Sequence, residues 1–223
     1  MLLSEIINSA NLSTKNFRVK FEKAGVAKYI SHLDLNRIFS RAIARAGIEV
    51  AHSEGFNPHP KIAFVSALSL GTESFCEFAD MKIIDTDNIS ESEIFDRLKN
   101  VFPSGINIKE VYAPKLDFKY IDRTRFYIFV KPTGFGASDL EELFSGDVTV
   151  EKKPGIVINL RDYTDNIAIS DGDYIKIDAV VKTNREMFLN PENIIKGVNA
   201  KYIVEDYFIQ KIEMYDKDLN IFV

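Results

Sequence analysis

The sequence predicts an α+β protein made of two ferredoxin-like (split βαβ) units packed together, each with an antiparallel sheet and its helices on one face. Patterns typical of strands and helices follow the order β-α-β-β-α-β through the first half of the chain, and a similar order recurs in the second half. The composition, with 46% hydrophobic and 27% charged residues, is that of an ordinary soluble globular protein. Two helices on one face of each sheet would leave the other face partly open.

The first unit is expected at residues 17–113, after an N-terminal arm at residues 1–16. Residues 17–22 alternate between apolar and charged side chains and predict a half-buried strand. Ser31, followed three residues later by Asp34, indicates a capping box, and Gly47 indicates a helix end, so a helix is expected over residues 32–46. Its apolar side chains recur at the spacing of one helix face: Leu35, Ile38, Phe39, Ala42, Ile43 and Ala46.

The other elements of this unit follow from the same two periodicities. They are β-rich flanks of a proline loop at 48–52 and 61–67, a strand at 74–84, a helix opened by Ser90 and ended by Pro103, and a strand at 106–112.

A polar connector is expected at residues 114–123, and the second unit at residues 124–223. Its predicted elements are a strand at 125–131, a helix at 138–144 capped by Ser138, a hairpin of 148–152 with 155–159, a strand at 174–182, a helix at 191–198 capped by Asn190, and a strand at 201–215. The tyrosines and phenylalanines of this half fall at strand spacing and are expected in the core. Two such units side by side are similar in topology to the Cas6-like RNA-binding proteins of CRISPR systems, an analogy of architecture alone.

Charge is unevenly distributed along the chain, whose net charge is −5. Residues 15–61 carry nine Lys or Arg against four Asp or Glu, a net charge of +5, and residues 62–110 carry four against nine. One basic surface on an acidic protein can concentrate an anionic ligand, but the whole chain lacks the basicity of a stand-alone nucleic-acid binder.

The single cysteine, Cys76, excludes an internal disulfide and suits the reducing cytoplasm. No apolar run is long enough for a membrane-spanning helix, so no membrane association is expected. The first residues include an early acid and no basic region, which makes them a poor secretory signal.

Three arginines, Arg37, Arg41 and Arg45, follow one another at intervals of four and form a stripe beside the apolar face of the helix at 32–46. Asp34 lies one turn before Arg37 and can pair with it. The stripe is either a solvated flank of the helix or an anion-binding row, because guanidinium groups match phosphate oxygens in two-point geometry.

The loop after this helix contains Phe56, Asn57 and His59, with prolines at 58 and 60, before Lys61. The prolines fix φ and remove backbone donors, so the loop is expected to be stiff. Phe56 either plugs the edge of the core or offers a ring for stacking a base.

All three histidines, His32, His52 and His59, lie within this basic segment, but none of their spacings matches a known metal motif. We therefore expect no metal and no cofactor. His32 sits at a helix start, where it is either a structural residue, an anion ligand, or an acid–base group acting on a phosphate ester.

The same segment carries a family resemblance. Its motifs are F-x-K-x-G and A-K-Y-I-S-H-L-D-L-x-R (residues 21–37), R-A-x-x-R-A-G (41–47), S-x-G-F-N-P-H-P-K-I (53–62) and G-T-E-S-x-x-E (71–77), with a weaker match at 158–161. This pattern closely resembles the radical-SAM-linked family DUF2344. The resemblance implies that the chain works with a radical-SAM enzyme as partner. The chain is not itself such an enzyme, because a radical-SAM cluster needs three closely spaced cysteines and this chain has one.

The sequence thus favours a non-catalytic accessory protein of a radical-SAM system that binds structured RNA or another anionic partner through the basic segment. The candidate residues are His32, Arg37, Arg41, Arg45, Phe56, Asn57, His59 and Lys61. The alternatives are a module that docks a radical-SAM enzyme without nucleic acid and, less favoured, a metal-free ribonuclease that uses His32.

Overall fold

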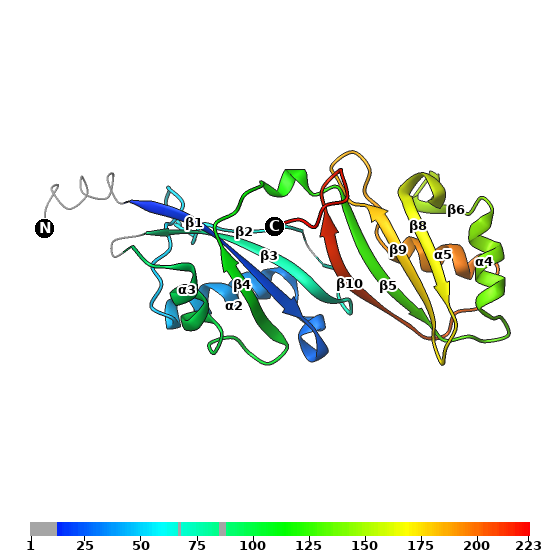
Figure 1. Cartoon of the computed structure of the whole chain (residues 1–223), viewed down its shortest axis with the longest axis horizontal. Helices are drawn as coiled ribbons and strands as arrows, with labels where there is room; N and C mark the ends of the chain where they lie inside the picture. Colours follow the sequence, from blue (N-terminus) through cyan, green and yellow to red (C-terminus); the bar gives the residue numbers. More distant parts are fainter. Residues whose placement is uncertain (1–12, 67, 85–87) are drawn as a thin grey trace, which may run out of the picture. The chain divides into compact units, whose positions relative to one another are not determined.

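The protein, described here from a computed structural model, is a mixed α+β molecule with four α-helices and mostly antiparallel sheet within residues 13–66, 68–84 and 88–223, the part of the chain that the structure describes (Figure 1). It divides into two compact units. The first comprises the residues up to Leu70 together with Cys76–Lys115, and the second comprises Gly71–Phe75 together with Leu116–Val223.

Within its described residues, the first unit contains four strands, two α-helices and a 3-10 helix. In chain order they are β1 (Thr14–Lys23), the 3-10 helix η2 (Gly25–Tyr29), α2 (His32–Arg45), β2 (Ile62–Phe64), β3 (Glu73–Ile84), α3 (Glu91–Leu98) and β4 (Ile106–Tyr112). The strands lie in the order β4-β1-β3, with β2 antiparallel to β3. Of the predicted arm at residues 1–16, residues 1–12 lie outside the described residues, and Thr14, Lys15 and Asn16 belong to β1, so the arm prediction is wrong for these three.

The two helices of this unit begin as the sequence predicts. The Ser31 hydroxyl accepts a hydrogen bond from the Asp34 backbone N–H at 3.1 Å, and the Ser90 hydroxyl accepts from the Glu93 N–H at 3.2 Å. Gly47 follows α2 with a φ of +65°, a conformation that glycine adopts without steric cost. The α2 side chains Leu35, Phe39 and Ile43 are buried in the core of the first unit, and Ala42 is buried as well.

The predicted β-rich flanks of the proline loop form less regular strand than expected. Of the described residues in these flanks, 48–52 and 61–66, only Ile62–Phe64 form a strand, while Val50 and His52 form single bridges, to Ile83 and Pro60 respectively. The two prolines explain the shortfall, because each removes a backbone donor from a possible ladder.

The second unit repeats the alternation of strands and helices and adds a hairpin. Its elements are η3 (Phe118–Tyr120), β5 (Arg123–Val130), α4 (Ala137–Ser145), β6 (Thr149–Lys153), β7 (Ile156–Asn159), η4 (Leu160–Tyr163), β8 (Thr164–Ser170), β9 (Ile175–Lys182), α5 (Glu192–Asn199) and β10 (Tyr207–Tyr215). The order of its strands is β10-β5-β9-β8, and β6 pairs only with β7. Helix α5 lies behind β9 and β8 in Figure 1.

Both units therefore share one strand order once the β6–β7 hairpin is set aside. In each, the last strand lies beside the first, and the third strand lies between the first and the second. The first residues of β3 belong to the second unit, in which Glu73 and Ser74 pair in parallel with Gln210 and Lys211 of β10.

Several boundaries in the second unit differ from those predicted. Strand β8 is missing from the prediction, because its sequence TDNIAIS has too few apolar residues to alternate clearly. The last strand begins at Tyr207 and not at residue 201, because the Lys201 and Tyr202 N–H groups still bond to Val198 at the end of α5.

The predicted caps of α4 and α5 are wrong by one or two positions. Gly136 caps α4, and Asp139 accepts a hydrogen bond from the Gly136 N–H at 2.7 Å, so Ser138 is inside the helix. Pro191 occupies the cap position of α5, although the Asn190 side chain still accepts from the Glu192 N–H at 3.1 Å. Each of the four α-helices in the described ranges is too short or too polar to cross a membrane.

Candidate functional site

The three arginines of α2 are all exposed but differ in what they contact. Arg37 forms an ion pair with Asp34 at 2.9 Å, and hydrogen bonds from Ser31 and from Arg37 lower the pKa of the Asp34 carboxyl. Arg45 donates to the Val101 carbonyl at 2.7 Å and so ties α2 to the turn after α3. Arg41 has no hydrogen-bonding or ion-pairing partner among the residues that the structure describes, so it is the arginine of the stripe that is available to a ligand.

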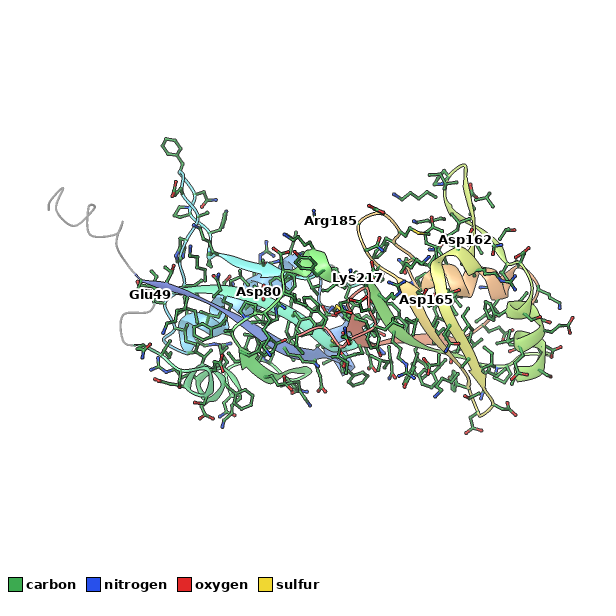
Figure 2. All side chains as sticks on the ribbon, turned by 45° about the horizontal axis from the view of Figure 1, so that its top comes forward. Glu49, Asp80, Asp162, Asp165, Arg185 and Lys217 are labelled. Atoms are coloured by element: carbon green, nitrogen blue, oxygen red, sulfur yellow. The ribbon has the colours of Figure 1, made fainter. Side chains whose placement is uncertain are left out.

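The proline loop forms a hydrogen-bonded arm, which we define as residues 51–61. Across it, the Ser53 N–H donates to the His59 carbonyl at 2.8 Å and the Lys61 N–H donates to the Ala51 carbonyl at 2.7 Å. The His59 N–H also donates to the Ser53 hydroxyl at 3.0 Å. In Figure 2 the pale blue ribbon of this segment extends away from the rest of the first unit. These bonds hold the arm as one ordered piece.

Phe56 lies near the tip of the arm with its side chain fully exposed, at a relative accessibility of 113%. Its neighbours Asn57 and His59 are exposed too, as is Lys61 at the base. Of the two interpretations of Phe56, the plug at the core edge is therefore wrong. Gly55, with a φ of +122°, provides the bend before the ring, in a conformation that favours glycine.

The histidines do not converge on one another. His32 begins α2, and its ring lies edge-on to the ring of Phe64, with 5.6 Å between their centroids. His52 pairs with Pro60 across the base of the arm. Within the described residues, no three His, Cys, Asp or Glu side chains come together as metal ligands would. The position of His32 allows contact with an anion at the helix start, but its neighbouring ring is apolar.

Sequence reasoning missed a buried ion pair in the same unit. Arg18 of β1 is fully buried and donates two hydrogen bonds to Asp80 of β3, at 2.7 and 2.9 Å (Asp80 is labelled in Figure 2). Tyr112 of β4 pairs with Arg18 in register, and burial raises the pKa of its phenol to about 12. No local signal pointed to this pair, because the alternation of residues 17–22 places Arg18 on the strand face opposite Phe17 and Val19, where a charged side chain is ordinarily exposed.

The motif G-T-E-S-x-x-E has a structural explanation. Thr72, Ser74 and Glu77 are buried, and Glu73 accepts a hydrogen bond from Gln210 at 3.0 Å beside the parallel pairing with β10. Thr72, Glu73 and Ser74 thus belong to the segment that pairs with β10 within the second unit, whereas Glu77 lies in the part of β3 that belongs to the first unit.

The expectation that the aromatic residues of the second half lie in the core is wrong for several of them: Tyr120, Phe188 and Tyr207 are exposed, and four more lie outside the core. Tyr127, Phe129, Tyr174 and Phe208 are only partly buried and contribute nothing to the core of their unit. The apolar run at residues 126–130 was the available signal, because an uninterrupted run places apolar side chains on both faces of a strand.

Comparison with known proteins agrees with the motifs of the first unit. The model of one family, described as "Uncharacterized protein conserved in bacteria (DUF2344)", matches residues 16–191. No curated protein matches the chain significantly. The family match spans more than half of the chain and includes α2, the arm and β3, but ends before β10. The chain belongs to the DUF2344 family.

Proposed function

We propose that this protein is an RNA-binding accessory protein, and that the arm of the first unit, helped by Arg41 of α2, contacts the RNA. The observation that carries this proposal is the fully exposed ring of Phe56 on an arm held by backbone hydrogen bonds. Stacking of a base on such a ring contributes about 1–3 kcal/mol to binding, whatever the base. Lys61, His59 and Arg41 supply cationic or polar groups for phosphates, and Asn57 supplies an amide for a base edge.

The stiffness of the arm suggests that it binds a ligand and is not merely a connecting loop. Pro58 and Pro60 restrict the unbound chain, and the bonds from Ser53 and Lys61 fix the arm before any ligand arrives. A preordered loop loses less conformational entropy on binding, so more of its contact energy remains as affinity.

We further infer that both units are ferredoxin-like and that the fold is topologically similar to Cas6-like RNA-binding proteins. The shared strand order of the two units, with the third strand between the first and the second, supports this inference. The analogy suggests a use for the architecture but assigns no chemistry, because a fold hosts many functions.

The link to a radical-SAM enzyme enters the proposal through the family resemblance described above. A [4Fe–4S] cluster is held by cysteine thiolates, and the only cysteine of this chain, Cys76, is buried. The donor set of the chain does not fit the cluster, so in our proposal the cluster belongs to a partner enzyme in the cytoplasm.

A second candidate function, docking of a partner protein, is favoured by a different observation. Three large apolar side chains at the start of α2 and in η2 are mostly exposed: Val26 at 77%, Tyr29 at 67% and Leu33 at 69%. Exposed apolar side chains that gather on one segment are typical of protein contacts. The metal-free ribonuclease hypothesis gains no such support from the apolar surroundings of His32.

Two variants of Phe56 test the proposed function. Binding of a labelled RNA stem-loop should weaken about tenfold in Phe56→Ala and stay within about twofold in Phe56→Tyr, which keeps the ring. Both variants should unfold at the wild-type temperature, because the side chain is fully exposed. Equal binding by Phe56→Ala and wild type would contradict the proposal. If Leu33→Asp no longer binds a radical-SAM partner enzyme but still binds RNA as wild type does, the docking function is favoured.

A further inference from the structure

The sheet of the second unit has one face that packs on its helices and one that does not. Along β5, Phe126, Ile128 and Val130 are buried in the core, while Arg125, Tyr127 and Phe129 alternate with them and stay partly exposed. Strand β9 repeats the pattern, with Ile175, Ile177 and Ala179 buried and Lys176 between them. The partly exposed residues therefore lie on the face away from the core. Helix α5 covers the other face, behind β9 and β8 in Figure 1.

Four aromatic rings gather on this face, which we name the aromatic face (Tyr127, Phe129, Tyr174 and Phe208). Phe129 of β5 and Phe208 of β10 are paired in register and stack, with ring centroids 4.5 Å apart and planes 13° from parallel. Tyr174 meets Phe208 at 5.4 Å, and Tyr127 meets Phe129 at 6.4 Å, both edge to face. The rings form a row across β5 and β10 and the start of β9.

Cationic groups lie directly on these rings. The Lys176 ammonium is 4.7 Å from the centroid of Tyr127, the Arg125 guanidinium is 5.3 Å from the same ring, and the Lys131 ammonium is 5.1 Å from Tyr174. Arg125 is also held by Asp178 through two hydrogen bonds of 2.8 and 2.6 Å, which raise the pKa of the guanidinium, and the Tyr174 hydroxyl donates to Asp206. Lys176 has no carboxylate partner among the described residues.

From this arrangement we propose that the aromatic face binds a single-stranded segment of RNA, with bases stacked on Tyr127 and Phe129 and phosphates on Lys176 and Lys131. The proposal rests on the proposed function and adds a second, separate surface on the other unit. Neighbouring rings on one strand are spaced so that consecutive bases can stack on them, and flexible lysines can move from the ring face to a phosphate when a base arrives.

The chemistry of the face favours an RNA strand over a protein partner. Its apolar groups are flat aromatic rings with cations over them, and the aliphatic side chains of β5 and β9, apart from Val180, lie on the core side. Base stacking tolerates every base, since each has a π-face, and the cations complement the negative backbone. A double helix would not reach the rings, because its bases are already stacked on one another.

The test compares three versions of one position in the full-length protein. A labelled oligouridine of about ten nucleotides is titrated against wild type, Tyr127→Phe and Tyr127→Leu. Tyr127→Phe keeps the ring and should bind within about twofold of wild type, whereas Tyr127→Leu keeps an apolar side chain without the ring and should bind about tenfold more weakly. Thermal unfolding of both variants provides the control for folding. Equal affinity of Tyr127→Leu and wild type, or equal losses in both variants, would overturn the proposal.

The outcomes separate this inference from the proposed function. If wild type binds an RNA stem-loop through Phe56 but shows no affinity for oligouridine, the aromatic face is refuted and the proposed function stands. If it binds neither RNA, both are refuted. Weaker binding of oligodeoxyuridine than of oligouridine supports RNA as the ligand, and equal binding makes the surface a site for single-stranded nucleic acid of either kind. Crosslinking of 5-iodouridine to the peptide containing Tyr127 and Phe129 supports the placement, and crosslinks confined to the arm contradict it.

Discussion

Arg18 of β1 and Asp80 of β3 form a largely buried ion pair in the first unit. Arg18 is fully buried and Asp80 is one-quarter exposed, at 26% of its side chain. Removing one member of a buried pair leaves a charge without its partner in a place that water reaches poorly. The two hydrogen bonds at 2.7 and 2.9 Å make Asp80 the group that offsets this cost.

We predict that Asp80→Ala lowers the free energy of unfolding by about 3 kcal/mol, measured by urea denaturation. The double variant Arg18→Met/Asp80→Ala should recover part of this loss, because the buried charge is gone as well. A single variant within about 0.5 kcal/mol of wild type would mean that the pair is not needed for stability.

Tyr112 gives the protein a pH dependence at the alkaline end. Burial raises the pKa of its phenol from 10.0 to about 12 in the folded protein, while the unfolded chain keeps the ordinary value. Above pH 10 the unfolded state therefore releases the proton first, and the stability that the neutral phenol gives is lost as the pH rises from 10 to 12. Within the described residues, the buried hydroxyl also has no hydrogen-bond partner.

We therefore predict that Tyr112→Phe leaves stability near pH 7 unchanged or slightly higher, since no hydrogen bond is removed. Between pH 10 and 12 the variant should lose less stability than wild type, as measured by urea denaturation at each pH. Tyr207, whose pKa is also raised to about 12 by its hydrogen bond to Glu192, is present in both proteins and cancels in the comparison. Parallel stability curves over this range would contradict the assignment.

The turn that leads into β4 requires a glycine at position 105. Gly105 has a φ of +90°, and a Cβ built on it would lie 2.5 Å from the Ala24 carbonyl oxygen and 2.7 Å from the Ala27 Cβ. The Gly105 carbonyl in turn accepts from the Ala24 N–H at 2.9 Å, so the turn supports the start of η2. Gly134 has a similar φ of +76°, but open space surrounds its Cβ position.

The pair of glycines separates backbone strain from steric overlap. Gly134→Ala should cost about 1 kcal/mol, the strain of a positive φ, whereas Gly105→Ala should cost about 2–4 kcal/mol, since the added methyl also meets backbone atoms that cannot move aside. Chemical denaturation of the two variants checks the difference. Equal losses would show that the contact with Ala24 relaxes freely.

The sequence predicted those elements best that have a side-chain cap and a clear period. Helix α2 and strand β4 were predicted with at most one residue of error, because Ser31, Gly47 and the alternation at 106–112 are local signals. Strand β8 was missed because its pairing with β9, and not its own sequence pattern, determines it. The start of β10 was misplaced because the Val198 carbonyl still accepts hydrogen bonds from Lys201 and Tyr202 after α5.

Within the candidate site, too, local contacts could be predicted from the sequence and long-range contacts could not. The pairing of Arg37 with Asp34 could be predicted from their spacing alone, because it lies within one helix. The exposure of Phe56, the tie between Arg45 and Val101, and the gathering of four rings on one sheet face depend on contacts between segments far apart in the sequence. Periodicity cannot tell which face of a strand a helix will cover, so the aromatic face could not be separated from the core in advance.

At the scale of the whole molecule, the chain carries two units of one strand order and a charge distribution that changes along the sequence. The basic segment, residues 15–61 with a net charge of +5, lies in the first unit. The grouping of Gly71–Phe75 with the second unit was not predictable, because it results from a parallel pairing between β3 and a strand more than a hundred residues later. Our account assigns RNA binding to a surface on each unit.

The salt dependence of RNA affinity in wild type, Arg41→Ala and Arg45→Ala tests this central claim most directly. Binding of RNA releases counterions, so the logarithm of the affinity should fall linearly with the logarithm of the salt concentration, by about 0.7 for each phosphate contacted on a single strand. Arg41→Ala should keep wild-type thermal stability and reduce the slope by roughly one contact. Arg45→Ala, the matched control, should lose some stability with its bond to Val101 and keep the wild-type slope. A wild-type protein with no measurable RNA affinity at low salt, or an affinity that does not change with salt, would contradict the account.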